Sequence, residues 1–239
     1  MITMNSAYRP PRCALLAACA ALVLLAPGAA AQSSPQTDAP TIAVLDLENG
    51  GSIGPDAQDL SDLGKGLGTM LTTEMMKNDR VRMVERDQLR ALLEEQKLTL
   101  SGMADPSTAV MVGKLAGAQY MIFGSFADVF SRLRIDVRVV EVETGTLRRA
   151  QEVTDDRENL FASVGRIATL LFEDLNLEPH TPTPPSPQVP ARAALVFSQG
   201  IGFEDRGDTA KAREMYERAL EIFPDYPDAR ERLEALGGE

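Results

Sequence analysis

The stretch Asn78–Gln96, NDRVRMVERDQLRALLEEQ, decides the fold, because a strand pattern in it runs directly into a helix pattern. Residues 80–84 alternate polar and apolar side chains, which is the period of a half-buried strand. Leucines then recur at spacings of three and four residues, which is typical of an amphipathic helix. These leucines are Leu89, Leu92 and Leu93. Asp87 suits the N-cap of this helix, and Glu85 would place its start two residues earlier.

The segments on either side complete a mixed sheet. Four further strands are predicted, at 42–47, 120–126, 133–142 and 146–153, the last of them polar enough for a sheet edge. Apolar faces predict helices at 60–75, 108–116 and 160–171. Residues 49–55 are rich in turn formers and predict a loop. The predicted fold class is therefore α/β, in the α+β sense of a mixed β-sheet with packed helices.

Three glycines, Gly64, Gly66 and Gly68, lie within the first predicted helix. Each weakens a helix by about 1 kcal/mol relative to alanine. A phosphate-binding loop would need Gly-Lys followed by Ser or Thr, whereas Lys65 is followed by Gly66. The glycines therefore predict close packing of this helix on the sheet.

Charge and residue types exclude several classes of function. The net charge of −11 argues against nucleic-acid binding, which needs a basic surface. The single histidine, His180, lies in a proline-rich segment that cannot hold catalytic or zinc-binding geometry. Adjacent carboxylates at 94–95 and 204–205 do not face each other on a helix, and those at 155–156 should diverge. We therefore predict no enzyme, no catalytic residue, no metal site and no cofactor.

Residues 1–31 are typical of an export signal. Positive residues precede an apolar run at 13–26, and residues 29–31 form an A-x-A cleavage pattern. We predict cleavage between Ala31 and Gln32, which would place the protein in the periplasm, associated in part with the outer membrane. In the alternative, LAAC at 16–19 is a lipobox, and Cys19 becomes acylated and tethers the protein to a membrane.

The chain divides into five segments by composition. We predict a signal peptide (1–31), a tether (32–40), an α/β domain (41–178), a proline-rich linker (179–190) and a helical module (191–239). Residues 193–226 fit the 34-residue pattern of a tetratricopeptide repeat, a pair of helices, and 227–236 suits a capping helix. The module is thus a small all-α hairpin. Such arrays need about three repeats, so a lone repeat must dock on its own first domain, on a second copy or on another protein.

A partner groove is predicted on the first helix of this repeat. It consists of Ala194, Phe197 and Ile201, with Glu204 and Asp205 at an acidic end. An apolar groove of this kind suits a peptide or a helix of another protein. In the alternative, the same residues dock on the first domain and meet no partner.

Six segments in order resemble the curli-secretion (CsgG-like) family of bacterial envelope proteins, over about residues 41–175. They are IAVLDLEN (42–49), LGKGLGTMLTTEM (63–75), RVRMVERDQL (80–89), LSGMADPSTA (100–109), GKLAGAQYMIFGS (113–125) and RVVEVETG (138–145). The resemblance implies a role in export of surface fibres, in flagellar or holdfast assembly, or in activation of peptidoglycan synthases.

We therefore predict a non-catalytic periplasmic accessory or scaffold protein that acts by protein–protein interaction in cell-envelope or surface-structure assembly and secretion. Its partners would be envelope or secretion components and further copies of itself. Three alternatives stay open: a subunit of a curli-type outer-membrane secretion channel, an LpoB-like lipoprotein activator of a peptidoglycan synthase, and a ligand-binding or enzymatic α/β domain. A channel subunit would need membrane hairpins of roughly 20 residues or more, whereas residues 127–132 and 143–145 leave little room.

Overall fold

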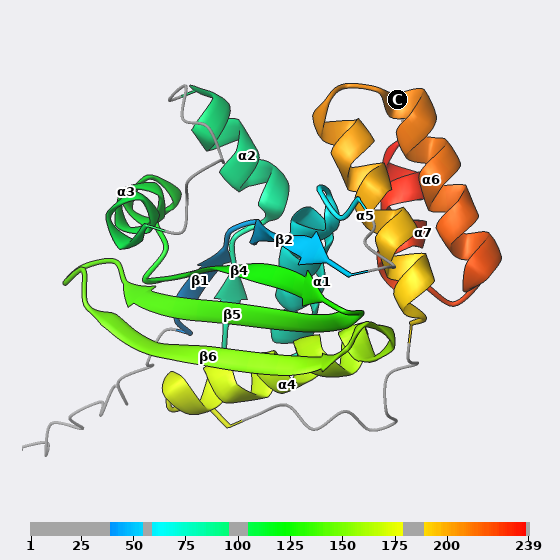
Figure 1. The fold of residues 1–239 in the computed structure, drawn as a ribbon. Helices are drawn as coiled ribbons and strands as arrows, with labels where there is room; N and C mark the ends of the chain where they lie inside the picture. The colour runs from blue at the N-terminus through cyan, green and yellow to red at the C-terminus, as the bar shows by residue number, and fades with distance from the viewer. Residues whose placement is uncertain (1–38, 55–58, 96–104, 179–188, 238–239) are drawn as a thin grey trace, which may run out of the picture. The chain divides into compact units, whose positions relative to one another are not determined.

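The central sheet combines parallel and antiparallel pairing, and helices cover both of its faces (Figure 1). The computed structural model describes residues 39–54, 59–95, 105–178 and 189–237. The strands within these ranges are β1 (Thr41–Val44), β2 (Glu48–Ile53), β3 (Arg82–Met83), β4 (Tyr120–Val129), β5 (Arg132–Glu141) and β6 (Leu147–Asp156). The helices are α1 (Leu63–Met76), α2 (Arg86–Glu95), α3 (Pro106–Ala116), α4 (Leu160–Asp174), α5 (Ala191–Asp205), α6 (Thr209–Ile222) and α7 (Pro227–Ala235).

The strand order is β3-β1-β4-β5-β6, and β2 also pairs with β4. β1 runs parallel to β3 and to β4, whereas β4, β5 and β6 form an antiparallel meander. β6 is an edge strand of this order, as its polar sequence predicts. The mixed sheet with packed helices confirms the predicted α+β class.

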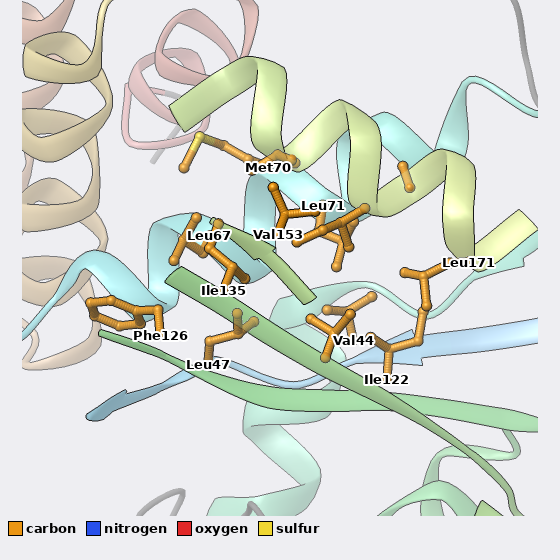
Figure 2. Close-up of a cluster of buried hydrophobic side chains, with 14 of the residues drawn as sticks. Val44, Leu47, Leu67, Met70, Leu71, Ile122, Phe126, Ile135, Val153 and Leu171 are labelled. Carbon is orange, nitrogen blue, oxygen red and sulfur yellow. The ribbon is translucent and has the colours of Figure 1, made fainter. Parts of the chain in front are cut away.

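Alternation along β1 divides the apolar side chains between two cores. Ile42 and Val44 lie in the core between the sheet and helices α1 and α4, and Figure 2 labels Val44 in this cluster. Ala43 and Leu45 lie in the core on the opposite face, with side chains of α2 and α3. Because side chains of a strand alternate between faces, one short strand contributes to both cores.

The prediction of a loop at 49–55 is wrong for most of that segment, because residues 48–53 form strand β2. β2 pairs in parallel with β4, with a register shift between Asn49 and Ser52. Gly51 lies in that irregularity with a φ of 109°, a conformation that glycine adopts without strain. Main-chain pairing with β4 therefore overrides the local turn preference of this glycine-rich segment.

Element boundaries shift slightly around the decisive stretch. The predicted strand at 80–84 is reduced to the two residues of β3. Helix α2 begins at Arg86, so its start is at the earlier of the two predicted positions. This shift matters, because it places Arg86 directly at the carboxyl end of the parallel strands.

The glycines of α1 allow close approach, as predicted, although not all of it is to the sheet. A Cβ at Gly64 would lie 1.8 Å from the carbonyl oxygen of Leu47, and one at Gly68 would lie 3.2 Å from that of Leu45. A Cβ at Gly66 would instead lie 1.8 Å from the Ser198 hydroxyl oxygen of α5. The glycines thus bring α1 against both the sheet and the carboxyl-terminal helices.

Helices α5, α6 and α7 share an aromatic core of their own. The Phe197 ring lies 5.6 Å from the Tyr216 ring and 5.0 Å from the Tyr226 ring, centroid to centroid. Ala191 and Ala194, also in α5, belong to the core of α1 and α4. Helix α5 therefore connects the two cores.

Alanine at two helical glycines should change stability in opposite directions. Gly64→Ala should lower the free energy of unfolding by about 1–3 kcal/mol, because the new methyl group overlaps the Leu47 backbone. Gly165→Ala, in α4, should raise it by about 1 kcal/mol, because a Cβ there meets nothing within 4 Å. Urea unfolding of both variants measures the difference, and equal shifts would contradict the close contact at Gly64.

Candidate functional site

A buried arginine joins the sheet to the carboxyl-terminal helices. Arg86 is 9% exposed, at the start of α2. Its guanidinium donates through Nε and Nη2 to the Asp46 carboxylate, at 3.0 and 2.8 Å, just after β1. It also donates through Nη1 and Nη2 to the Asp205 carboxylate, at 2.9 and 2.8 Å, where α5 ends. One guanidinium therefore bonds two carboxylates, one from each side of the junction.

Asp205 lies at the centre of this cluster. It also pairs with Arg90, at 2.9 Å, and with Lys65 of α1, at 3.3 Å. Burial by itself would raise the pKa of Asp205, but hydrogen bonds and charges from Arg86, Arg90 and Lys65 hold that pKa well below its usual range. Burial likewise opposes the charge of Arg86, and the two carboxylates raise the pKa of Arg86 well above its usual value. Both groups stay ionised at any physiological pH.

The helices at this junction approach closely because small residues face each other. Gly66 of α1 packs on Ser198 of α5, which is buried and donates its hydroxyl to the Ala194 carbonyl oxygen at 2.7 Å. Gly202 of α5 packs on the Asp62 carboxylate, where an added Cβ would lie 2.3 Å away. The ion pairs of Asp205 form beside this contact, so packing and charge act at the same junction.

A second group of bonds connects α7 to α2 and α5. Arg232 pairs with Asp87 at 2.8 Å and with Glu204 at 3.2 Å. Glu204 also accepts a hydrogen bond from the Tyr216 hydroxyl at 2.5 Å. Burial and this bond raise the pKa of the Tyr216 phenol well above its usual value. Arg232 thus connects α7 to α2 and α5 through two carboxylates, as Arg86 connects α2 to the end of β1 and to α5.

A cleft of about 260 Å³ lies between α1, the start of α2 and α7. Asp228 lines it and accepts a hydrogen bond from the Thr73 hydroxyl at 3.2 Å. Burial raises the pKa of Asp228 to about 6, despite the Thr73 bond, which lowers it. Thr69 and Thr72 also line the cleft and donate their hydroxyls to carbonyls of α1. Within the described ranges, no three His, Cys, Asp or Glu side chains group as metal ligands would.

The five predicted groove residues all lie at this junction. Ala194, Phe197 and Ile201 are at most 1% exposed, since α1, α6 and α7 surround α5. Glu204 and Asp205 point to different arginines, as expected for neighbours on a helix. Other helices of the same chain cover these residues. This is the arrangement described by the alternative in which the repeat docks on its own first domain. Binding of a partner through these residues stays a prediction.

Several sequence predictions fall on residues outside the described ranges. Cys19, Ala31 and Gln32 do so, as does most of the linker, at 179–188. The division into domains also stays a prediction. In the described parts of the chain, no helix has the length and apolar character needed to cross a membrane.

Sequence reasoning missed Arg86, Asp46 and Arg232. Arg86 and Asp205 are separated by 119 positions, so no local pattern connects them. The one available signal was an arginine at the first turn of a helix, where a cation is unfavourable unless a carboxylate lies nearby. That signal indicates a partner without identifying it.

The structure is that of an α+β protein in which the helical pair α5 and α6 packs against α1. Residues 27–131 match the family model described as curli production assembly/transport component CsgG, and residues 193–236 match a tetratricopeptide repeat. These matches confirm the resemblance seen in the sequence: the chain carries a CsgG-like segment followed by a tetratricopeptide repeat. No curated protein matches the chain.

Three solved structures are similar to this chain at low sequence identity. The LpoB C-terminal domain from Salmonella enterica is 16% identical, with a TM-score of 0.39, over 50% of this chain and 84% of that one. Lipoprotein GNA1162 from Neisseria meningitidis is 11% identical, with a TM-score of 0.40, over 57% and 94%. A PelC dodecamer from Paraburkholderia phytofirmans is 11% identical, with a TM-score of 0.37, over 58% and 90%.

Removal of Arg86 should destabilise the whole unit. Arg86→Met leaves Asp46, whose side chain is only 16% exposed, without its cation, so the free energy of unfolding should fall by about 3 kcal/mol. Arg80→Met is the matched control, because the Arg80–Glu178 pair is 59% and 81% exposed and should contribute about 0–1 kcal/mol. Chemical denaturation measures both, and equal effects would show that burial of the Arg86 cluster carries no stability.

Asp228 should make stability depend on pH. Its folded pKa of about 6 exceeds the unfolded value near 3.9, so its contribution is complete below pH 4 and is lost as pH rises through 6. Asp228→Asn keeps an acceptor for Thr73 and should raise stability at pH 7.5 by about 2–3 kcal/mol, with no change at pH 4. Asp225→Asn, whose side chain is 85% exposed, is the control. A gain that is equal at both pH values would contradict this assignment.

Proposed function

We propose that this protein is a non-catalytic accessory or scaffold protein of the periplasm, acting by protein–protein contacts in the assembly of envelope or surface structures. Two matches support the proposal. The CsgG family description names curli production, assembly and transport, and tetratricopeptide repeats build binding surfaces in other proteins.

The observation that carries the proposal is the ion cluster in which the buried Arg86 pairs with the partly buried Asp46 and Asp205. A buried cluster stabilises less than apolar packing of equal volume, but its bonds form in one arrangement only. The cluster therefore fixes the direction in which α5, α6 and α7 extend from the sheet. A scaffold needs such a fixed angle between its binding surfaces, whereas an enzyme needs a reactive centre.

The charge states at the junction also favour a scaffold. Asp205 and Arg86 have pKa values displaced away from neutrality, in the direction that keeps each ionised, so neither exchanges a proton readily at pH 7. Asp228 titrates near pH 6, but Thr69 and Thr72 in the same cleft donate to carbonyls of their own helix. Of the threonines that line this cleft, Thr73 alone is bonded to the titrating carboxyl, at 3.2 Å.

The proposal is tested by cross-linking in intact cells, followed by fractionation and mass spectrometry. We expect a periplasmic species that begins at Gln32 and is cross-linked to other envelope proteins. Cys19→Ser is the matched control: under the proposal it changes neither the fraction nor the amino terminus.

Two results would contradict the proposal. A membrane-bound, acylated species beginning at Cys19, released by Cys19→Ser, would favour the lipoprotein alternative. Recovery of the periplasmic protein with no cross-linked envelope protein, under conditions that cross-link a known envelope complex, would remove the scaffold role.

A further inference from the structure

The cleft between α1, the start of α2 and α7 carries uncompensated negative charge. The two arginines that line it, Arg86 and Arg232, each pair with two carboxylates. Three further carboxylates line it, those of Asp228, Glu85 and Glu231. Among the described residues, none of these three has an ion-pair partner. The charge left over in the cleft is therefore negative, and it favours a cation as ligand.

Asp228 is the buried member of the three. It is 9% exposed, whereas Glu85 and Glu231 are exposed. Its Oδ1 accepts the Thr73 hydroxyl at 3.2 Å, and within the described ranges its Oδ2 accepts no hydrogen bond. A buried carboxylate without a counter-charge is costly, so Asp228 gains from any cation that reaches it through the cleft.

The charged groups around Asp228 do not act as its counter-ion. Burial is the main reason that the pKa of Asp228 is raised to about 6, and Glu231 of α7 and Glu74 of α1 add to the rise. The Thr73 bond and the charge of Lys77 lower this pKa, but Lys77 pairs with Glu74 at 2.5 Å. Asp228 is nevertheless mostly ionised at pH 7, and its charge is directed into the cleft rather than spent on a neighbour.

The neutral groups of the cleft suit an alkylammonium ion. Thr69 and Thr72 donate their hydroxyl protons to carbonyls of α1, so their oxygens can only accept further bonds. Met76, which is 53% exposed, and Ala235 supply apolar surface. An ammonium group has three donors and no acceptor, and its aliphatic chain lies along apolar surface. The cleft therefore offers acceptors to the head of such a ligand and apolar contacts to its chain.

The same carboxylates are poorly arranged for a metal ion. Nowhere in the described parts of the chain do three His, Cys, Asp or Glu side chains group as metal ligands would. A divalent ion needs several oxygens within about 2.0–2.6 Å, whereas an ammonium group needs one deep carboxylate and gains from others at the rim. The volume of about 260 Å³ is below the roughly 300–1,000 Å³ of most ligand sites, which suits one aliphatic chain.

We propose that this cleft binds a primary alkylammonium group, with the nitrogen at the Asp228 carboxylate. The aliphatic chain lies along Met76 and Ala235, and Glu231 adds negative charge at the rim. A free amine and a lysine side chain of another protein both present this group. The inference does not rest on the proposed function, because it concerns the purified protein and a small probe.

An NMR titration of the purified protein with n-pentylammonium chloride at pH 7.5 tests the site. The backbone amides of Thr69, Thr73 and Asp228 should shift saturably, with a Kd on the order of 1 mM, as suits so small a ligand. Sodium chloride and n-pentanol are the controls for ionic strength and for the aliphatic chain. No saturable shift up to about 50 mM probe, or equal shifts with either control, would overturn the proposal.

A matched pair of variants assigns the binding to Asp228. Asp228→Asn should bind the probe at least tenfold more weakly, whereas Asp225→Asn, whose side chain is 85% exposed in the wild type, should bind it unchanged. Because Asp228→Asn is expected to be the more stable protein at pH 7.5, its loss of binding cannot come from unfolding. Equal binding by both variants would contradict the assignment.

The pH dependence of binding gives a second measurement. Lowering the pH from 7.5 to 5 should weaken binding by the wild type about tenfold, because Asp228 takes up a proton near pH 6. The residual binding of Asp228→Asn should not change over this range. Wild-type binding that stays constant between these pH values would refute the role of the Asp228 charge.

A short peptide with one lysine, compared with the same peptide acetylated at the lysine amine, distinguishes the two sources of the group. Binding of the lysine peptide at least as tight as that of n-pentylammonium, and lost on acetylation, assigns a protein lysine. Binding of n-pentylammonium but not of the peptide assigns a free amine. Peptide binding in the cleft that survives acetylation would overturn the proposal, because the ammonium group would then be unnecessary.

Discussion

The arrangement of this molecule depends on one buried guanidinium and the two carboxylates that flank it. Removing Arg86 from water is costly, and only the pairing with Asp46 and Asp205 offsets that cost. Asp46 follows the first strand and Asp205 ends the first helix of the repeat, so the cost is offset only when both parts are folded and docked. The apolar contacts around α5 supply attraction, and the ion cluster selects one docking geometry from those that apolar contact alone would allow.

Helix α1 makes that geometry reachable. Its three glycines have no side chains at the points where the segment after β1 and helix α5 contact it from two directions. A helix with ordinary residues at these positions would hold α5 further away, beyond hydrogen-bonding distance between Asp205 and the guanidinium. The weak intrinsic helix propensity of this segment is therefore compensated by packing on both sides.

Much of the fold follows from the sequence, because periodicity reports which faces are buried. Leu89 and Leu93 are buried as their spacing predicts, and the tetratricopeptide pattern places α5 and α6 correctly. β2 could not be predicted, because its pairing with β4 depends on a partner strand more than 70 residues away. The sequence indicated only one side of the candidate site. Asp205 was predicted at the acidic end of a groove, but its partner Arg86 lies 119 positions earlier, and no local pattern connects the two residues.

The long separation between Asp46, Arg86 and Asp205 has a consequence during synthesis. A chain that ends before α5 has Arg86 with one carboxylate instead of two, and it exposes the face of α1 that Ser198 covers. It also leaves Ala191 and Ala194 missing from the core of α1 and α4. Opening of such an incomplete chain costs less, so proteases degrade it preferentially. Docking of α5 therefore raises the free energy of local opening for the sheet and α1 as well as for the helices that follow.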